Sequence, residues 1–222
     1  LMKKTLIKIC GMTNIDDIEC VNDIDGIDYI GIILVDTSPR CVTYDVAEKL
    51  INACNKDKKI VTVFMNQSEE YIAAAINNLN PDILQFHGNE SLEFCNKFKK
   101  PFIKTFHVEN DSLSIDKEFM KHAHALLLDT SIGDLRGGTG KIFDWTILNK
   151  NKLIEEISLS LPCFVAGGLN PSNIKDLISN YNPSGIDVSS GLESSIGKKD
   201  HLLMKKLIEN VRISQLDYYE KS

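Results

Sequence analysis

Several common sequence signals are missing from this chain of 222 residues. Its six cysteines show no paired C-x-x-C spacing, so the sequence gives no support for a zinc site or a disulfide. Its 25 Lys and Arg residues do not outnumber 31 Asp and Glu residues, and the net charge of -6 argues against a nucleic-acid partner. No apolar run approaches the ~20 residues that span a bilayer. The start of the chain lacks the apolar region of a signal peptide. We therefore expect a cytoplasmic protein with no membrane partner.

Eight short runs of apolar and β-branched residues recur along the chain, separated by segments with helical periodicity. Several runs are apolar on both faces, which is typical of parallel strands that are covered by helices. Eight strand–helix units predict an α/β fold, a single (β/α)8 TIM barrel. The rival is an open doubly wound sheet, but that fold usually carries its phosphate-binding glycines after the first strand, whereas here glycine-rich turns follow the last three runs. The runs are 5–10, 29–35, 60–64, 83–86, 102–106, 125–128, 163–166 and 185–188.

No linker or shift in composition divides the chain. We expect one TIM-barrel domain over residues 1–222, with a frayed tail at 214–222. We expect one helix to be capped at its N-terminus by Thr13 or Asn14, and another by Ser68. Apolar residues at helical spacing predict buried stripes on two helices. These stripes consist of Tyr71, Ile72, Ala75, Ile76 and Leu79 in one segment and of Leu202, Leu203, Leu207 and Val211 in another.

The apolar run 125–128 stops abruptly at Asp129, which is followed by a glycine-rich loop at 137–141 and by the aromatic residues Phe143 and Trp145. Long loops without secondary structure of their own are usually functional or disordered. In a barrel enzyme, catalytic residues follow the carboxyl ends of the strands. Asp129 is therefore a candidate acid or base. The alternative is that Asp129 only caps the next turn.

Two glycine-rich turns at the last two strand ends predict a phosphate site. Adjacent glycines let backbone N–H groups approach an anion, and a helix that begins just beyond them adds its positive end. The corresponding loops often bind phosphate in TIM barrels. A Gly-Gly pair alone also marks any tight turn, so the prediction depends on the two segments together. It indicates a small phosphorylated ligand, and the predicted phosphate-binding residues are Gly167, Gly168, Ser190 and Gly191.

Cys10 is the last residue of the first run and precedes a glycine. A cysteine in a strand is most often an inert core residue, but this position lies on the expected catalytic rim. Lys8 lies two residues earlier and points to the same face of the strand. Its ammonium group is expected to favour the thiolate form of Cys10. A thiol and the carboxyl group of Asp129 could then divide the roles of base and acid.

Six motifs occur in order from one end of the chain to the other: K-I-C-G, S-P-R-C-V, Q-F-H-G, L-D-T with G-G-T-G-K-x-F-D-W, A-G-G-L-N-P and G-I-D-V-S-S-G-L-E. Together they resemble the phosphoribosylanthranilate isomerase family, which acts in the third step of tryptophan biosynthesis. The related histidine-pathway isomerase has an aspartate where this chain has Cys10. Two departures are small, since Phe86 replaces a more usual leucine and Cys41 replaces a common aromatic residue.

The resemblance implies an Amadori rearrangement, an aldose-to-ketose isomerisation that needs no metal and no cofactor. It implies that Asp129 is the general acid and Cys10 the general base. Arg40 matches the family arginine that binds the anthranilate carboxylate, a task suited to its planar fork; the alternative is a solvated surface arginine. Further substrate contacts would come from Lys8, His87 and Asp187. We expect a monomer or a homodimer with a small phosphorylated substrate as its ligand.

Two other functions remain open. A phosphate-binding barrel without catalysis would need only the phosphate loops, so the presence of Cys10, Asp129 and Arg40 together argues against it. A bifunctional isomerase would also accept the histidine-pathway substrate, which carries two phosphates. That substrate would favour a second glycine-rich site after the third and fourth strands, where the sequence offers only Asn66 and Gly88.

Overall fold

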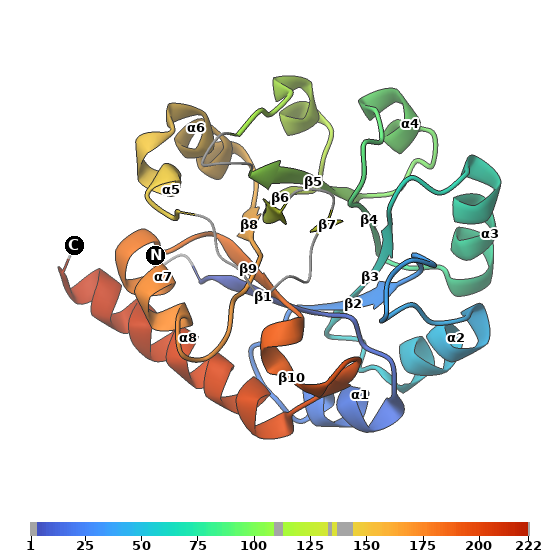
Figure 1. The fold of residues 1–222 in the computed structure, drawn as a ribbon, viewed down its shortest axis with the longest axis horizontal. Helices are drawn as coiled ribbons and strands as arrows, with labels where there is room; N and C mark the ends of the chain where they lie inside the picture. Colours follow the sequence, from blue (N-terminus) through green and yellow to red (C-terminus); the bar gives the residue numbers. More distant parts are fainter. Residues whose placement is uncertain (1–3, 109–112, 133–134, 137–143, 222) are drawn as a thin grey trace.

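Eight parallel strands close into a barrel in this computed structural model, which describes residues 4–108, 113–132, 135–136 and 144–221 (Figure 1). Neighbouring strands follow the chain order from β5 back to β1 and continue through β9, β8 and β6; pairing of β5 with β6 closes the circle. The expected (β/α)8 barrel is confirmed. The barrel strands are β1 (Leu6–Cys10), β2 (Tyr29–Ile33), β3 (Lys59–Phe64), β4 (Ile83–Phe86), β5 (Phe102–Val108), β6 (Ala125–Ile132), β8 (Cys163–Val165) and β9 (Gly185–Val188).

Helices surround the barrel, as Figure 1 shows. Between β5 and β6 the described residues contain only a short 3-10 helix, η1 (Lys117–Lys121). The predicted caps are present, because the side chains of Asn14 and Ser68 accept hydrogen bonds from the first turns of α1 and α3. The α-helices are α1 (Ile15–Asn22), α2 (Tyr44–Ala53), α3 (Glu69–Leu79), α4 (Leu92–Asn96), α5 (Ile147–Lys150), α6 (Lys152–Ser160), α7 (Ile174–Tyr181) and α8 (His201–Lys221).

Alternation along the strands separates two apolar layers. One set of side chains fills the space between the strands and the helices, and it includes Ile7, Ile9 and Leu126. The alternate positions point into the barrel, where a second cluster contains residues such as Tyr29 and Phe164. Because successive side chains point to opposite faces of a strand, every second residue along β1, β4 and β6 points inward. This alternation directs Cys10, the last residue of β1, and Asp129, in the second half of β6, toward the barrel mouth.

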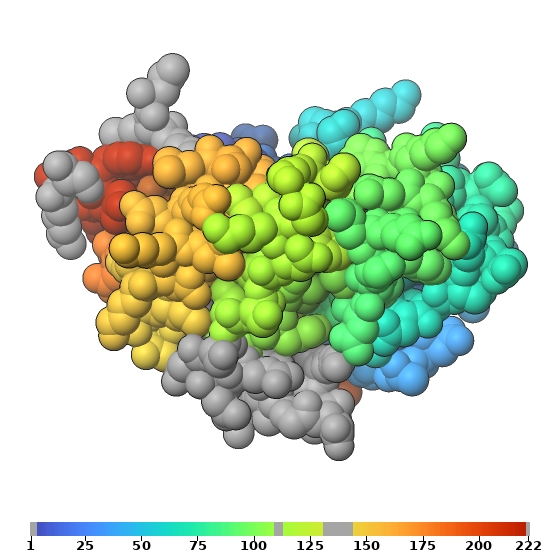
Figure 2. Space-filling model, turned by 90° about the horizontal axis from the view of Figure 1, so that it is seen from above, coloured from blue at the N-terminus to red at the C-terminus, as the bar shows by residue number. Residues whose placement is uncertain are grey.

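Sequential units lie side by side around the molecule, and Figure 2 shows the colours passing in order from orange through yellow and green to cyan. This arrangement is what a barrel of consecutive strand–helix units produces. Within the described part of the chain, no helix combines the length and apolar character needed to cross a membrane.

The structure differs from the prediction at some strand boundaries and contains a hairpin that was not predicted. β2 ends at Ile33, before the expected residue 35. β6 does not stop before Asp129 but continues to Ile132 and pairs in antiparallel fashion with β7 (Leu135–Arg136). A second hairpin, β10 (Glu193–Ser195) with β11 (Lys198–Lys199), has no counterpart in the prediction. The glycine-rich loop at 137–141 lies outside the described residues.

The C-terminal segment was also predicted incorrectly. Instead of a frayed tail at 214–222, α8 continues to Lys221, and Ser214 and Gln215 are buried. Leu202 was assigned to the buried stripe of this helix, but it is 77% exposed, and Met204 takes its place in the core beside Leu207. The stripe on α3 is confirmed, since Ile72, Ala75 and Leu79 are buried, with Tyr71 and Ile76 packed partly against the core.

Candidate active site

A cavity of about 530 Å³ opens at the carboxyl ends of the barrel strands. It collects side chains that are far apart in the sequence, as expected for the catalytic face of this fold. Lys8 is fully buried and does not line the cavity. The other nine residues that the sequence singled out all contribute to its wall, namely Cys10, Arg40, His87, Asp129, Gly167, Gly168, Asp187, Ser190 and Gly191.

Cys10 ends β1 directly beside Gly31 of β2 in the barrel register. A Cβ atom added at Gly31 would lie only 2.5 Å from the Cys10 sulfur, so a side chain there would displace the thiol. Below Cys10, Lys8 and Asp187 are register partners on β1 and β9, and the Lys8 Nζ donates to Asp187 Oδ2 at 2.8 Å. The thiol therefore lies above a buried ion pair.

The protonation of Cys10 differs from the expectation drawn from Lys8. Burial is the largest influence and raises the pKa of the Cys10 thiol above its ordinary value, while the charge of Lys8 offsets only part of the increase. Asp187 acts in the opposite direction to Lys8 and raises the pKa of the thiol further. Burial would lower the pKa of Lys8, but Asp187 and Cys10 raise it overall, so Lys8 stays charged. Burial thus favours the thiol form of Cys10, and the charge of Lys8 favours the thiolate.

Asp129 lies within β6, and its carboxylate is oriented by two contacts. Its Oδ1 accepts the backbone N–H of Thr130 at 2.8 Å, and its Oδ2 lies 3.3 Å from His87 Nε2. The other ring nitrogen of His87 lies 3.1 Å from the Thr105 hydroxyl and 3.3 Å from Gln85 Nε2. Asp129 is 5% exposed and lines the cavity. A proton on Oδ2 would therefore lie between the His87 ring and the cavity.

Three potential ligand groups for a metal ion lie together at this side of the cavity. Single ligand atoms of His87, His107 and Asp129 lie within 4.8 Å of one another. The His107 Nε2, however, is 3.0 Å from the backbone carbonyl of His87. We interpret the group as a hydrogen-bonded set that fixes the His87 ring beside Asp129.

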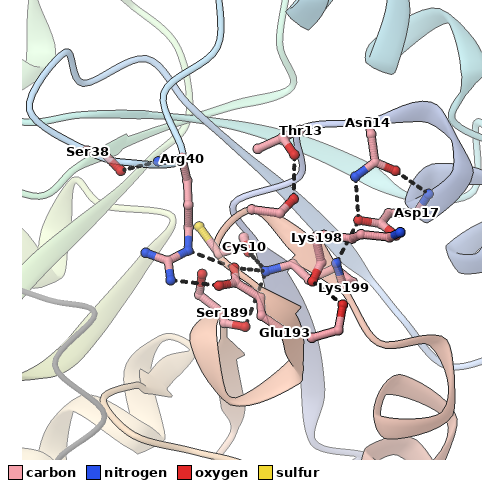
Figure 3. A network of polar contacts seen from close by, with 12 residues as sticks. Cys10, Thr13, Asn14, Asp17, Ser38, Arg40, Ser189, Glu193, Lys198 and Lys199 are labelled. Carbon is pink, nitrogen blue, oxygen red and sulfur yellow. Dashed lines mark hydrogen bonds and ion pairs between the residues drawn. The ribbon is translucent and has the colours of Figure 1, made fainter.

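Arg40 approaches the cavity from the loop between β2 and α2, and one edge of its guanidinium group is already occupied. Its Nε and Nη2 donate to the two carboxylate oxygens of Glu193 at 2.7 Å each (Figure 3). This bidentate pair raises the pKa of Arg40, which stays charged. Among the described residues, no partner is found for Nη1. Arg40 is therefore a positioned cation with one edge still available, rather than a solvated surface arginine.

Lys199 connects the Arg40–Glu193 pair with the backbone of Cys10. Its ammonium group donates to Glu193 Oε1 at 2.9 Å, to the Cys10 carbonyl at 2.7 Å and to the Ser189 carbonyl at 3.2 Å (Figure 3). Burial alone would raise the pKa of Glu193, but hydrogen bonds from Arg40 and the charge of Lys199 lower it, so the carboxylate stays ionised. Burial lowers the pKa of Lys199, and Glu193 offsets part of that decrease.

The β10–β11 hairpin that carries Glu193 and Lys199 is itself attached to the start of α1. The Lys199 backbone N–H donates to Asp17 Oδ2 at 2.8 Å, and Asn14 Nδ2 donates to the same oxygen at 2.7 Å. At the hairpin turn, the Thr13 hydroxyl donates to the Gly197 carbonyl (Figure 3). These contacts fix the position of Glu193 relative to β1.

The two predicted phosphate loops lie against each other. Gly167 and Gly168 have φ values of 86° and 66°, in the left-handed region that favours glycine. A Cβ atom at Gly191 would collide with the Leu169 carbonyl, so the turns after β8 and β9 can approach only because residue 191 has no side chain. Among the described residues, no backbone acceptor is found for the N–H groups of Gly167, Gly168 and Gly191. The two loops thus offer several donors to an anion.

The cavity wall between Arg40 and the barrel centre is mostly apolar, and it is lined by Ile33, Val35, Pro39, Val63 and Met65. Two buried oxygens of cavity-lining residues on or after β9, Asp187 Oδ1 and Ser189 Oγ, have no hydrogen-bond partner among the described residues. The cavity therefore combines apolar side chains, a cation, unpartnered oxygens and glycine-rich turns with N–H groups.

The sequence did not single out Glu193, Lys199 or Ser189. Glu193 and Ser189 stand in the quoted motif G-I-D-V-S-S-G-L-E, so their place was visible but their partners were not. Lys199 lies in a short polar hairpin, where a lysine would ordinarily be solvated. The loop residues at 137–141 and Phe143, which the sequence placed near Asp129, lie outside the described residues.

Known proteins show similarity over nearly the whole chain. A sequence profile of the N-(5′phosphoribosyl)anthranilate (PRA) isomerase family matches residues 7–210. The N-(5′-phosphoribosyl)anthranilate isomerase of Legionella pneumophila (strain Corby) is 42% identical over 208 residues, covering 92% of this chain and 96% of the relative. The crystal structure of phosphoribosyl anthranilate isomerase from Thermotoga maritima has a TM-score of 0.77 at 30% identity and covers 94% and 98% of the two chains. Another crystal structure of such an isomerase, in complex with reduced 1-(o-carboxyphenylamino)-1-deoxyribulose 5-phosphate, has a TM-score of 0.75 at 28% identity, with the same coverage.

Proposed function

Because the chain belongs to the N-(5′-phosphoribosyl)anthranilate isomerase family, we propose that it converts N-(5′-phosphoribosyl)anthranilate into 1-(o-carboxyphenylamino)-1-deoxyribulose 5-phosphate in tryptophan biosynthesis. The observation that carries this proposal is the single cavity in which a carboxyl group, a thiol, an arginine and two glycine-rich loops come together. Each of these groups matches one part of the substrate. The furanose ring needs an acid, the sugar carbon a base, the benzoate a cation and the phosphate a set of N–H donors.

Asp129 acts as the general acid in this scheme. Its protonated carboxyl group donates a proton to the furanose ring oxygen while the ring C–O bond breaks and the anilino nitrogen forms a Schiff base with the anomeric carbon. The contacts from the Thr130 N–H and His87 hold the carboxyl group in one orientation at the cavity wall. A fixed acid near the reacting oxygen contributes both proximity and proton transfer.

Cys10 acts as the general base. Its thiolate removes the proton from C2′ of the Schiff base, which gives an enolamine, and the enolamine tautomerises to the ketone. One proton leaves Asp129 and one arrives at Cys10, so transfer between the two groups through solvent restores the enzyme without any net proton change. Lys8, buried below Cys10, stabilises the thiolate by its charge. No redox step occurs.

The remaining groups bind the substrate. Arg40 would hold the anthranilate carboxylate, with the aromatic ring against the apolar side chains of the cavity wall. The N–H groups of Gly167, Gly168, Ser190 and Gly191 would surround the phosphate. The partnerless oxygens of Asp187 and Ser189 are placed to bind sugar hydroxyl groups. We further propose that the protein works in the cytoplasm, as a monomer or a homodimer.

A direct assay tests the proposed function. Purified protein is mixed with freshly made phosphoribosylanthranilate, and product formation is followed in a coupled assay. Cys10→Ala and Asp129→Asn should each lose about 10²- to 10⁴-fold in kcat, the usual contribution of a general base or acid. Both variants should still bind a product analogue, because neither removes the phosphate loops or Arg40. Near-parental turnover in either variant would show that its residue has been assigned the wrong role.

A further inference from the structure

Glu193 does not line the cavity, yet it makes the closest polar contacts of Arg40. Its side chain is 5% exposed, and both of its oxygens bind the guanidinium group, through Nε and Nη2. A guanidinium group has two edges that can each bind a carboxylate through two N–H groups. Glu193 occupies the edge formed by Nε and Nη2. The edge formed by Nη1 and Nη2 is the one left for a second carboxylate.

The charges in this cluster leave room for one more anion. Arg40 and Lys199 contribute two cations, and Glu193 is the only carboxylate that the described residues bring into contact with either side chain. One positive charge is therefore unbalanced, and Arg40 presents it to the cavity. A carboxylate bound to the free edge would balance the cluster, whereas an uncharged ring would leave it unchanged.

The cluster is held rigidly. All three hydrogens of the Lys199 ammonium group have acceptors, namely Glu193 and the carbonyls of Cys10 and Ser189. Glu193 Oε1 accepts from both Lys199 and Arg40, so the position of the guanidinium group is tied to the backbone of the residue that carries the thiol. A carboxylate bound by Arg40 is thereby fixed relative to Cys10.

From this geometry we infer that Glu193 is a positioning and specificity-determining residue, which fixes the free edge of Arg40 toward the aromatic carboxylate of the substrate. Glu193 itself touches no substrate and acts through Arg40. The inference rests on the proposed function, because it presupposes a substrate with a carboxylate on its aromatic ring. It predicts that loss of Glu193 matters for such a substrate and not for one without the carboxylate.

The experiment compares two substrates, phosphoribosylanthranilate and an analogue that bears aniline in place of anthranilate. Glu193→Gln should raise the KM for phosphoribosylanthranilate by about 10- to 100-fold, the range expected when a hydrogen bond to a charged group is lost. The KM for the aniline analogue should stay close to that of the parent protein. Arg40→Ala should show the same preference. The double variant should be no worse than Arg40→Ala alone, because Glu193 acts only through Arg40.

A matched control and a second variant keep the test decisive. Glu90 is another buried carboxylate paired with a lysine, Lys104, at 2.8 Å, but among the described residues it makes no polar contact with Arg40. Glu90→Gln should therefore show no preference between the two substrates. If Glu193→Gln does not fold, Glu193→Asp keeps the charge but is too short to hold both guanidinium nitrogens. Calorimetry can then compare how tightly Glu193→Asp binds the reduced product analogue and the same analogue without its carboxylate. Only binding of the ligand with the carboxylate should be weakened.

The failures are distinguishable. A parent protein without isomerase activity would overturn the proposed function. This inference alone would be overturned if the parent protein is active but its Glu193 variants show an equal rise in KM for both substrates. Additive effects of Arg40→Ala and Glu193→Gln would also overturn it. In those cases Glu193 would serve only to hold the β10–β11 hairpin.

Discussion

At the scale of single residues, the reactivity of the Cys10 thiol depends on two opposite charges below it. The ammonium group of Lys8 lowers the pKa of the thiol, and the carboxylate of Asp187 raises it. Burial exceeds both effects and keeps the pKa above its ordinary value. The reaction of Cys10 with a thiol reagent should therefore become faster with pH in the alkaline range, because only the thiolate reacts.

The two charges predict shifts of opposite sign in this pH profile. Lys8→Met removes the group that stabilises the thiolate, so the rise in thiol reactivity should move to higher pH. Asp187→Asn removes a repelling charge and frees Lys8 to pair with the thiolate, so the rise should move to lower pH. Rates of reaction with a thiol reagent from pH 6 to 10 measure both shifts, and the Cys10→Ala variant gives the background reaction of the other cysteines. Two shifts in the same direction would contradict the role of this ion pair.

Sequence alone could place these residues but not their protonation. The spacing of Lys8 and Cys10 correctly put both on the inner face of β1, since side chains alternate along a strand. The pKa of the thiol depends on how much water the closed barrel excludes and on Asp187 of β9, which is remote in the sequence. Local charge pointed to a thiolate, whereas burial, a property of the whole fold, points to a thiol.

At the scale of secondary structure elements, long apolar strands were easier to predict than short polar ones. The barrel strands are apolar because they are buried on both faces. β10 and β11 are only three and two residues long and contain Glu, Ser and Lys, so no periodicity marks them. Their stability comes from contacts with Asp17 and Cys10, which belong to the other end of the chain. α8 likewise continues beyond the expected end, because Gln215 donates to the Thr5 hydroxyl at the start of β1.

The turns after β8 and β9 give a prediction at this scale. Gly191→Ala places a methyl group against the Leu169 carbonyl, so the two loops must move apart. The N–H groups that we assign to the phosphate would then no longer point to the same place. Because hydrogen bonds to a charged group would be weakened, KM should rise by about 10- to 100-fold. Steady-state kinetics measure the change, and inorganic phosphate should become a weaker competitor in the variant.

A second glycine separates this effect from a general loss of stability. Gly26 has a positive φ of 98°, and its added Cβ would meet Arg212, neither of which lines the cavity. Gly26→Ala should lower the melting temperature without raising KM. If Gly191→Ala lowered the melting temperature but left KM unchanged, these loops would not bind the phosphate.

At the scale of the whole molecule, the barrel mouth is asymmetric. One side, after β8 and β9, has N–H groups without acceptors among the described residues. The opposite side, after β3 and β4, uses its polar groups internally: the Asn66 N–H donates to Glu90 at 2.7 Å, and Lys104 binds both Glu90 and the Gly88 carbonyl. The sequence already indicated this asymmetry, because its glycine-rich turns follow only the later strands.

This asymmetry predicts which substrate the protein rejects. The histidine-pathway substrate carries a phosphate at each end, and its second phosphate would have to lie near the buried carboxylate of Glu90 rather than near free donors. The Asn66 N–H and Lys104 already bind Glu90, so a second phosphate would have to compete with this carboxylate for both donors, which should prevent productive binding. Purified protein should therefore turn over phosphoribosylanthranilate but give no measurable product from the histidine-pathway substrate under the same conditions. Turnover of both at comparable kcat/KM would mean that the loops after β3 and β4 rearrange to bind an anion, and that one phosphate site does not define the specificity of this barrel.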